Sequence, residues 1–585
     1  MAPFGKLLSF FSLAVLAQAA NKDQWRGRSI YQLLTDRFAG GGQCDLGSRN
    51  YCGGNWRAII DKVDYIQGMG FDAIWISPTA LNIEGYSRWG EAYHGYWTAD
   101  PTRLNPHFGT ADDLKALSSA LHSRGMHLMV DIAINALAST NPSIEASALA
   151  SAAQGNFLFK DPANFHKRCG IQWENRTSEE YCWLVPGHEE NEVALLDLAT
   201  ETPAVANKLI QWVPGYVKEY GIDGFRIDAS KHMGKKFQHD FCKAAGIFCI
   251  GEVAGDNTQY AASYQGTDGI DSVFGFGLMY GFNYVFGNGD RMDRLTHYID
   301  GAARSYPDQT VIGSFLDNQD LPRINSRTGD KSRIYNAIVG SFMWGGIPTV
   351  YYGLEQDIAD GPYDPNNREA LWNYNNYATN GDTYKRIANL NKIRKYLGSR
   401  GNFHKAVAKR VSSNLYEAAL QRDEALIVLT NRGDGANGQW TVPNTHFGKN
   451  VNVVDLLSCV KGKTDVNAAL KVTYKSGFPF VWVKAEIASA GGFCGGAGQA
   501  LVADPVSADD IVEPTSTEEE DTPIAPTSVA VGDENGPTFI TNPDVTATSS
   551  ASSTDATSST GSEGQNSSSG TCKRSRKRSD VAGKR

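Results

Sequence analysis

Short apolar segments alternate with amphipathic ones from Asn21 to about Leu390. The apolar segments each have the length of one buried strand and end in polar residues; they read FDAIWISP, MHLMVDIAIN, IDGFRIDA, IFCIGEV and VIGSFLDN. The segment TADDLKALSSALHSRG has the apolar spacing of a helix, with Thr110 as its N-cap and Gly125 at its end. This alternation predicts an α/β fold, a (β/α)8 TIM barrel, whose active site lies at the carboxyl ends of the strands.

Two regions depart from this alternation. Between residues 136 and 197 the chain is rich in Asn, Ser and Glu, which indicates a subdomain inserted after the third strand. From about Gly401 the segments ALIVLTNR, VNVVDLL and FPFVWVKAEI alternate as strands do, which predicts a C-terminal antiparallel β domain. The predicted limits are 21–135 and 198–395 for the barrel, 136–197 for the insertion, and 396–494 for the β domain.

The first twenty residues, 1–20, have the pattern of a secretory signal peptide. Lys6 gives the positive start, Leu7 to Leu16 the apolar core, and Ala17-Gln18-Ala19 a cleavage site. The apolar run is too short to span a bilayer as a helix, so no transmembrane helix is expected here. The alternative is a buried N-terminal helix. The pattern predicts a secreted protein.

Composition narrows the class of partner. The formal net charge of -9 argues against nucleic acid. The 25 Tyr, 25 Phe and 12 Trp suit a large core and also a ligand with flat apolar faces, such as a sugar. Residues 495–585 are predicted to be a disordered tail, rich in Ser and Thr and O-glycosylated. Asn175 and Asn566 lie in N-glycosylation motifs.

Nine cysteines in a secreted chain are candidates for disulfides. No pair of CxxC motifs is present, which argues against a zinc-thiolate site. Three pairs are close in sequence, one encloses a longer loop, and Cys572 remains over. The candidate pairs are Cys44 with Cys52, Cys169 with Cys182, Cys242 with Cys249, and Cys459 with Cys494.

Three predicted strand ends carry a carboxylate. Asp228 lies in GFRIDASKH, Glu252 in GEV and Asp320 in FLDNQD, with Arg226 two residues before Asp228. Retaining glycoside hydrolysis needs a carboxylate nucleophile and a protonated carboxylic acid about 5 Å apart. Arg226 is expected to keep the nucleophile ionised. The alternative is that acidic residues at strand ends only solvate loops, which explains one such residue more easily than three.

The chain from Asn21 to Cys494 resembles the fungal secreted α-amylases, within the α-amylase family of glycoside hydrolases. The segments that carry the resemblance are SIYQLLTDRFA, YCGGNW, DKVDYIQGMGFDAIWISP, EAYHGYW, GTADDLKALSSALHSRGMHLMVD, GFRIDASKH, CIGEV, GIPTVYYGLEQ and DPNNREALW. In that family the cysteine before IGEV pairs with a later one. This sequence has none there, and Cys242 is the candidate substitute for it.

The resemblance implies roles for individual residues. Asp228 is the nucleophile, Glu252 the general acid and base, and Asp320 stabilises the transition state by holding sugar hydroxyls. Tyr96 is expected to stack on a glucose ring. The residues at substrate-binding positions of the family are His94, Tyr96, Trp97, Arg226, Lys231, Gln319, Asp364 and Arg368.

The resemblance also implies a calcium ion between the barrel and the insertion. Its ligands map onto Asn135, Glu180, Asp197 and the backbone carbonyl of His232. Oxygen donors of mixed type suit this cation. The alternative is that these are unrelated polar residues.

Two positions depart from the family pattern. Family members carry a histidine after the calcium-binding Asn and another before the final aspartate of the fourth conserved segment. Here these positions are Ala136 and Gln319. Both histidines hydrogen-bond the sugar at the cleavage subsite, and Gln319 is expected to donate one such bond.

Three interpretations remain open. The protein is a weakened α-amylase, an enzyme that transfers glucan chains to sugar acceptors, or a non-catalytic glucan-binding protein. The paired replacement and the tail resemble the fungal cell-wall-associated 4-α-glucanotransferases, so we favour transfer. The expected partner is an α-glucan or maltooligosaccharide, bound by a monomer that the tail associates with the cell wall.

Overall fold

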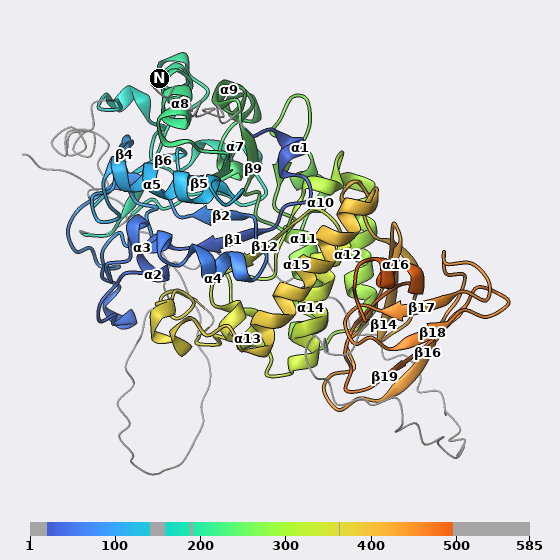
Figure 1. Cartoon of the computed structure of the whole chain (residues 1–585). Coiled ribbons are helices and arrows are strands. Elements are labelled where there is room, and N and C mark those ends of the chain that lie inside the picture. The colour runs from blue at the N-terminus through green and yellow to red at the C-terminus, as the bar shows by residue number, and fades with distance from the viewer. Residues whose placement is uncertain (1–19, 141–157, 188–190, 362, 495–585) are drawn as a thin grey trace, which may run out of the picture. The chain divides into compact units, whose positions relative to one another are not determined.

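Eight parallel strands form the central sheet of the computed structural model, which describes residues 20–140, 158–187, 191–361 and 363–494. The strand order is β10-β9-β8-β5-β2-β1-β12-β11, and a parallel bridge from Phe274 to Gly313 joins the two ends. The sheet is therefore a closed barrel, which confirms the predicted fold class (Figure 1). The strands are β1 (Ile30–Leu33), β2 (Ala73–Ile76), β5 (His127–Ile132), β8 (Gly224–Ile227), β9 (Phe248–Gly251), β10 (Ser272–Val273), β11 (Gly313–Ser314) and β12 (Ile347–Tyr351).

The strands are apolar because helices or packed side chains cover both of their faces. Every residue of β1, β2, β8 and β9 is buried, as expected for a parallel sheet. The prediction was too long for VIGSFLDN, since β11 contains only Gly313–Ser314. The polar residues that follow these strands lie at the carboxyl end of the barrel.

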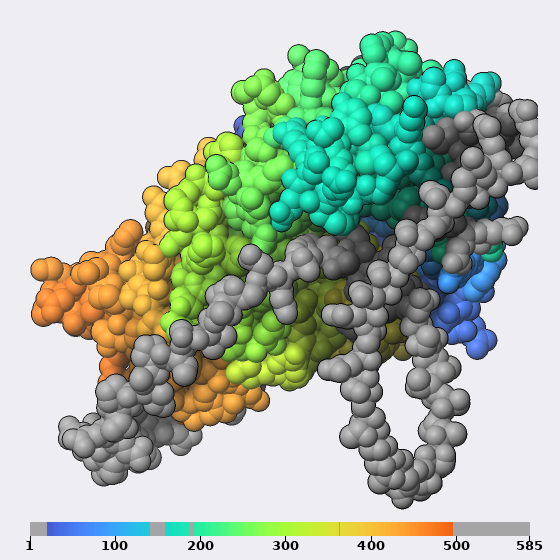
Figure 2. Space-filling view, turned by 180° about the vertical axis from the view of Figure 1, so that it is seen from behind, coloured from blue at the N-terminus to red at the C-terminus, as the bar shows by residue number. Residues whose placement is uncertain are grey.

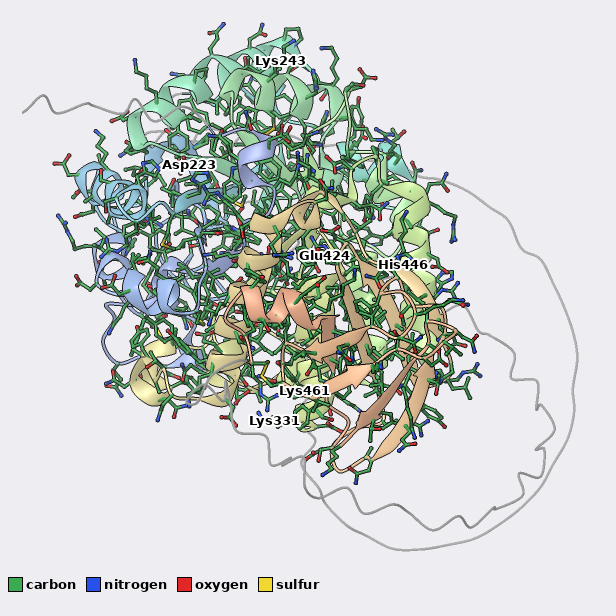
Figure 3. All side chains as sticks on the ribbon, turned by 45° about the vertical axis from the view of Figure 1, so that its right-hand side comes forward. Asp223, Lys243, Lys331, Glu424, His446 and Lys461 are labelled. Carbon is green, nitrogen blue, oxygen red and sulfur yellow. A yellow bond between two sulfur atoms is a disulfide. The ribbon has the colours of Figure 1, made fainter. Side chains whose placement is uncertain are left out.

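Helices surround the barrel strands (Figure 1). Helix α5 begins as predicted: Thr110 Oγ1 accepts from the amide of Asp113, and the Asp113 carboxylate accepts from the amide of Thr110. Lys243 on α9 and Lys331 on α14 are exposed charged side chains on the outside of these helices (Figure 3). The helices of this part are α1 (Lys22–Trp25), α2 (Thr35–Phe38), α3 (Trp56–Ile60), α4 (Val63–Gly68), α5 (Ala111–His122), α8 (Pro203–Tyr220), α9 (Lys235–Ala245), α10 (Thr258–Ala262), α11 (Phe276–Phe282), α12 (Met292–Ser305), α13 (Ile324–Arg327), α14 (Lys331–Trp344) and α15 (Asp382–Arg400).

The segment after β5 leaves the barrel through a hairpin. Strands β6 (Ala136–Ser139) and β7 (Ala194–Asp197) are antiparallel, with Ala136 opposite Asp197. Between them lies α7 (Arg176–Tyr181). A second hairpin, β3 (Ala80–Asn82) with β4 (Thr98–Leu104), follows β2. Apolar residues of the inserted segment, among them Trp183, belong to the same hydrophobic core as the barrel helices, and Figure 2 shows this segment in cyan beside barrel segments in green.

The C-terminal region is the predicted antiparallel β domain. It ends in a short helix, α16 (Ala485–Ala490), where the sequence predicted that the last strand continues. Asn336 on α14 donates to the carbonyl of Gly477 and accepts from the amide of Thr430, which fixes this domain on the barrel. Its strands are β13 (Lys409–Ser413), β14 (Glu417–Arg422), β15 (Ala425–Thr430), β16 (Gly438–Val442), β17 (Asn452–Asp455), β18 (Lys461–Lys463), β19 (Leu470–Tyr474) and β20 (Phe480–Lys484).

The predicted disulfides are confirmed. The structure joins Cys44 to Cys52, Cys169 to Cys182, Cys242 to Cys249, and Cys459 to Cys494. Residues 1–19 of the predicted signal peptide, Cys572, Asn566 and the tail from residue 495 lie outside the described residues. None of the helices in the described part of the chain is long and apolar enough to span a bilayer.

Candidate active site

The structure brings the predicted carboxylates to one end of the barrel. Asp228 and Glu252 directly follow β8 and β9, and their backbone amides still bond to Ile132 and Ile227 of the neighbouring strands at 3.1 and 3.0 Å. The barrel pairing therefore fixes their Cα positions. Asp320 follows β11 after a short loop.

Arg226 connects the predicted nucleophile to the predicted acid. Its Nη1 lies 2.5 Å from Asp228 Oδ1, and its Nη2 lies 2.9 Å from Glu252 Oε2. The Arg226 side chain is 1% exposed, whereas those of Asp228 and Glu252 are 23% and 11% exposed. One guanidinium thus holds both carboxyl groups, and retaining glycosidases place their two carboxyl groups about 5 Å apart.

Asp131 belongs to this cluster and was missed by the sequence analysis. It lies on β5, is fully buried, and accepts from Arg226 Nη1 at 2.9 Å. Its Oδ2 accepts from Trp75 Nε1 at 3.1 Å and from the Tyr96 hydroxyl at 2.8 Å. The available signal was a carboxylate within the otherwise apolar strand HLMVDI. Asp131 therefore holds Arg226 from within the barrel.

Burial and neighbouring charges both shift the pKa values of this cluster. Burial raises the pKa of Asp228 well above its usual range even though Arg226 opposes the shift, and Glu252 and Asp131 add repulsion. Burial likewise raises the pKa of Asp131 to about 6, against the effect of Arg226. Arg226 favours the ionised form of Asp228, but burial, the largest influence, and the neighbouring carboxylates outweigh its effect on the pKa.

Asp320 ends a chain of alternating charges. Arg368 lies 3.1 Å from Asp320 and 3.3 Å from Asp364, which in turn lies 2.9 Å from Arg49 Nε. Tyr93 also donates to Asp364. Burial opposes ionisation of Asp364, but Arg368, Tyr93 and Arg49 outweigh it and hold its pKa at about 2. Asp364 is therefore a fixed anion beside the predicted substrate residues.

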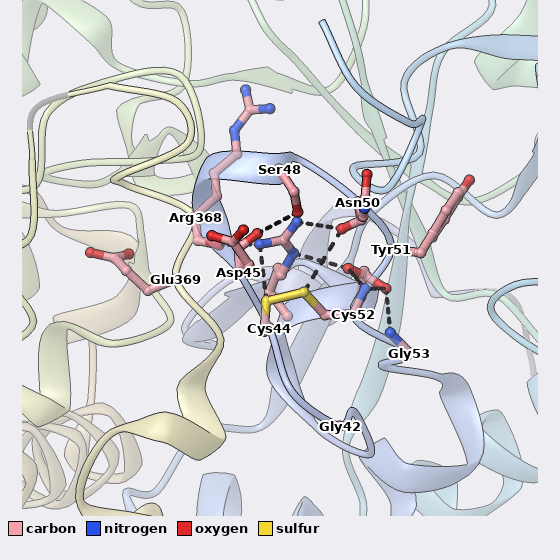
Figure 4. Close-up of a disulfide and its surroundings, with 12 residues drawn as sticks. Gly42, Cys44, Asp45, Ser48, Asn50, Tyr51, Cys52, Gly53, Arg368 and Glu369 are labelled. Atoms are coloured by element: carbon pink, nitrogen blue, oxygen red, sulfur yellow. Dashed lines mark hydrogen bonds and ion pairs between the residues drawn. A yellow bond between two sulfur atoms is a disulfide. The ribbon is translucent and has the colours of Figure 1, made fainter. Parts of the chain in front are cut away.

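Arg49 was also missed, and a disulfide loop presents it. The loop Cys44–Cys52 is drawn in Figure 4. Arg37 donates to the carbonyl of Asn50 at 2.9 Å, and Asp36 accepts two backbone N–H groups at the end of the loop. Arg49 itself has a left-handed backbone with φ 52°, which is uncommon for a residue other than glycine. The anchored loop thus fixes the partner of Asp364.

The aromatic residues predicted to bind sugar lie together. His94 Nδ1 accepts from the amide of Tyr96 at 3.0 Å, and its ring meets Trp97 edge-on at 4.7 Å between centroids. Burial lowers the pKa of His94 to about 3, so its imidazole is neutral. Tyr96 and Trp97 are half-buried. Lys231 forms an ion pair with Glu179 at 2.8 Å.

Gln319 is held inside the barrel by a second glutamine. Its side chain is buried, the residue being 1% exposed, and its Oε1 accepts from Gln32 Nε2 at 2.5 Å. Gln32 on β1 thus provides a partner for this amide on the inner side of the barrel, and the bond from Gln319 to a sugar stays a prediction. The Gln319 backbone carbonyl accepts from Arg368 and Asn367. Ala136 is half-buried at the start of β6.

Three of the predicted calcium ligands converge. One end of the Asn135 amide lies 2.8 Å from the carbonyl oxygen of His232 and 3.3 Å from Asp197 Oδ1. If the Asn135 nitrogen occupies this end, the amide donates to the His232 carbonyl and to Asp197. If the Asn135 oxygen occupies it, the oxygens of all three residues face one another, an arrangement that a hard cation stabilises. These residues therefore fit the predicted ion.

Glu180, the fourth predicted ligand, has another partner. Its carboxylate pairs with Arg176 at 2.6 Å, one turn away on α7. The neighbouring Glu179 is buried instead, and its carbonyl accepts from His232 Nδ1 at 2.9 Å. The helix phase thus buries Glu179 and leaves the Glu180 side chain, 15% exposed, paired with Arg176. Within the described ranges, no group of three or more His, Cys, Asp and Glu side chains is placed to hold a metal.

Comparison of the sequence with known proteins identifies the family to which this chain belongs. The model of the α-amylase catalytic domain matches residues 32–395, and that of α-amylase domain C matches residues 411–501. Alpha-amylase 2 of Schwanniomyces occidentalis is 38% identical over 519 residues, covering 84% of this chain and 99% of that protein. The chain belongs to the α-amylase family. Alpha-amylase mde5 of Schizosaccharomyces pombe is 36% identical over 497 residues, covering 84% and 93%.

Solved structures of α-amylase-family proteins share the fold. An α-amylase from Malbranchea cinnamomea superposes with a TM-score of 0.76 at 38% identity, covering 81% of this chain and all of that one. A cyclomaltodextrin glucanotransferase, CldA, superposes with a TM-score of 0.67 at 25% identity, covering 78% and 99%. The family assignment implies a glycoside hydrolase acting on glucans.

Proposed function

We propose that this protein cleaves α-1,4-glucosidic bonds of starch-like glucans or maltooligosaccharides with retention, and transfers the cleaved chain to sugar acceptors. The observation that carries the cleavage is the Arg226 guanidinium, which holds Asp228 and Glu252 within reach of one glycosidic bond. The partly exposed Asp228 and the half-buried Tyr96 and Trp97 fit a sugar chain. All three predicted catalytic carboxylates are present, which argues against a purely binding role.

The geometry supports a reaction in two displacements. Asp228 Oδ attacks the anomeric carbon of the glucosyl unit, the glycosidic C–O bond breaks, and Glu252 gives its proton to the departing oxygen. An acceptor hydroxyl then gives its proton to Glu252 while its oxygen replaces Asp228 on the anomeric carbon. Arg226 and Asp131 keep the two carboxyl groups in place during both steps. Asp320 accepts hydrogen bonds from sugar hydroxyls in the transition state.

The cleavage subsite supports transfer over hydrolysis. Ala136 has no hydrogen-bonding side chain, and the amide of Gln319 is buried, so both positions lack the donors that family members have there. Weaker binding of the glucosyl unit in the transition state must be offset from elsewhere. A sugar bound as acceptor supplies contacts and orientation, whereas water supplies neither. The second candidate function is that of an ordinary α-amylase with weakened hydrolytic activity. The names of the similar proteins, which are α-amylases, favour this candidate.

Product analysis separates the two candidates. Maltopentaose is incubated with the protein, products are resolved by chain length over time, and new reducing ends are counted. We expect products longer than maltopentaose before the substrate is exhausted. The variant Ala136→His with Gln319→His should shift the products toward hydrolysis, since both donors return. If the parent releases only shorter sugars and one reducing end per cleavage, it is an ordinary α-amylase.

We further propose that Asn135, Asp197 and the His232 carbonyl hold a calcium ion. Their convergence supports this, and a bound ion would hold the insertion on the barrel beside Lys231. Because an ion bound only by the folded state stabilises it, a chelator should lower the melting temperature. Adding Ca²⁺ back should restore it. A melting temperature unchanged after exhaustive chelation would contradict this assignment.

Secretion is part of this proposal. Four disulfides fit an oxidising compartment, and the Ser- and Thr-rich composition after residue 495 suits a stalk that reaches the cell wall.

A further inference from the structure

Two buried amides meet at the carboxyl end of β1. Gln32 is 2% exposed and Gln319 is 1% exposed, and their single hydrogen bond runs from Gln32 Nε2 to Gln319 Oε1 at 2.5 Å. Gln319 directly precedes Asp320, and its own carbonyl is held by Arg368 Nε at 3.0 Å. The pair therefore lies directly under the predicted cleavage subsite.

The pair is costly as a purely structural element. Gln32 Oε1 and Gln319 Nε2 are buried, and neither has a partner among the described residues. A buried polar atom without a partner loses its hydration without compensation, whereas two apolar side chains of similar shape would avoid that cost. Such unsatisfied groups need an explanation, and functional sites are one place where they persist.

The direction of the bond gives that explanation. Without Gln32, the Gln319 side chain would lose the bond that holds its Oε1 inside the barrel, and turning toward the carboxyl end of the barrel would bring the amide to water and sugar hydroxyls. Gln32 offers it a partner on the inner side instead. The residue at position 32 therefore controls whether position 319 presents a donor to the sugar.

We propose that Gln32 is a positioning residue that holds the Gln319 amide out of the cleft, so that the pair sets the preference for sugar acceptors over water. The proposal deepens the transfer function proposed above and rests on it. The ligand concerned is the glucosyl unit of a maltooligosaccharide at the cleavage subsite. Replacing Gln32 with an apolar residue returns a donor to that unit without changing residue 319.

A double-mutant cycle tests the pair. The variants are Gln32→Leu, Gln319→Leu and the double replacement, with maltopentaose as substrate. We expect Gln32→Leu to lower the ratio of elongated products to new reducing ends by at least about threefold. Gln319→Leu and the double variant should keep the parental ratio, since neither has an amide to present. The melting temperature should fall in Gln32→Leu and recover in the double variant, because removing both partners leaves no orphaned amide.

A matched control separates the effect of contact with Gln319 from the effect of removing any buried glutamine. Gln421 is also a buried glutamine on a strand: it donates one bond of 2.7 Å to the carbonyl of Asp423, and its Oε1 has no partner within the described part of the chain. Gln421→Leu should lower the melting temperature without changing the product ratio. If Gln32→Leu does not fold, Gln32→Asn, which is too short to reach Gln319, takes its place.

Three outcomes would overturn the proposal. The first is a product ratio that Gln32→Leu leaves unchanged while the melting temperature falls. The second is a ratio that changes equally with and without Gln319. The third concerns a parent protein that makes no elongated products, a result that removes the transfer function itself. In that case the same four proteins are compared by kcat/KM for hydrolysis. A change in kcat/KM on Gln32→Leu that is the same with and without Gln319 then refutes the positioning role.

Discussion

Replacing Asp228 with asparagine is expected to abolish turnover and to leave the fold intact. The amide cannot form the covalent glycosyl-enzyme, so hydrolysis and transfer should both fall by at least about a thousandfold. Asparagine keeps the shape of the side chain and can still accept from Arg226. Initial rates on maltopentaose check this. Residual activity within about tenfold of the parent would remove Asp228 from the role of nucleophile.

The same variant should be more heat-stable than the parent at neutral pH. Burial raises the pKa of Asp228 in the folded protein above its value in the unfolded chain. The folded state therefore binds more protons, so the contribution of this carboxyl to stability is greatest at acidic pH and is lost as the pH rises through the folded pKa. Asn does not titrate. Its advantage in melting temperature should grow from pH 4 to pH 8, and a constant difference over that range would contradict this.

Replacing Asp131 with alanine is expected to give the largest loss of stability. The change removes a fully buried carboxylate that accepts from Arg226, Trp75 and Tyr96. Breaking a buried ion pair by deleting one partner costs about 3 to 5 kcal/mol, because the other charge remains buried. Urea unfolding followed by tryptophan fluorescence measures this. Activity should fall as well, since Arg226 loses its support on the inner side.

Asp131→Asn provides the matched control. Its oxygen can still accept from Trp75 or Tyr96, so the geometry is kept while the charge is lost. We expect a smaller loss of stability than in Asp131→Ala, with activity reduced because Arg226 then pairs more strongly with Asp228. Equal stability of the alanine variant and the parent would show that Asp228 and Glu252 alone satisfy Arg226.

The sequence predicted what depends on local pattern. Buried strands are apolar runs that end in polar residues, so the barrel and the trio Asp228, Glu252 and Asp320 follow from reading along the chain. The phase of a helix is harder to read. In α7 the neighbours Glu179 and Glu180 carry the same chemistry, and only packing decides that Glu179 faces inward.

Residues that act through distant partners could not be predicted in this way. Gln32 meets Gln319 across 287 positions, and Arg49 meets Asp364 across 315. Neither Gln32 nor Arg49 has a local pattern that marks it, because the barrel closure and the disulfide loop create these contacts. The buried state of Gln319 has the same cause, since its orientation depends on the residue that β1 places beneath it.

Trapping the covalent intermediate tests the central claim most directly. The Glu252→Gln variant is incubated with 5-fluoro-α-maltosyl fluoride, whose leaving group needs no proton, and is then digested and examined by mass spectrometry. We predict one fluoromaltosyl unit attached to the peptide that contains Asp228, and none in Asp228→Asn. Release of fluoride without any adduct, or an adduct on Asp320 or Asp131 instead, would contradict a retaining mechanism with Asp228 as its nucleophile.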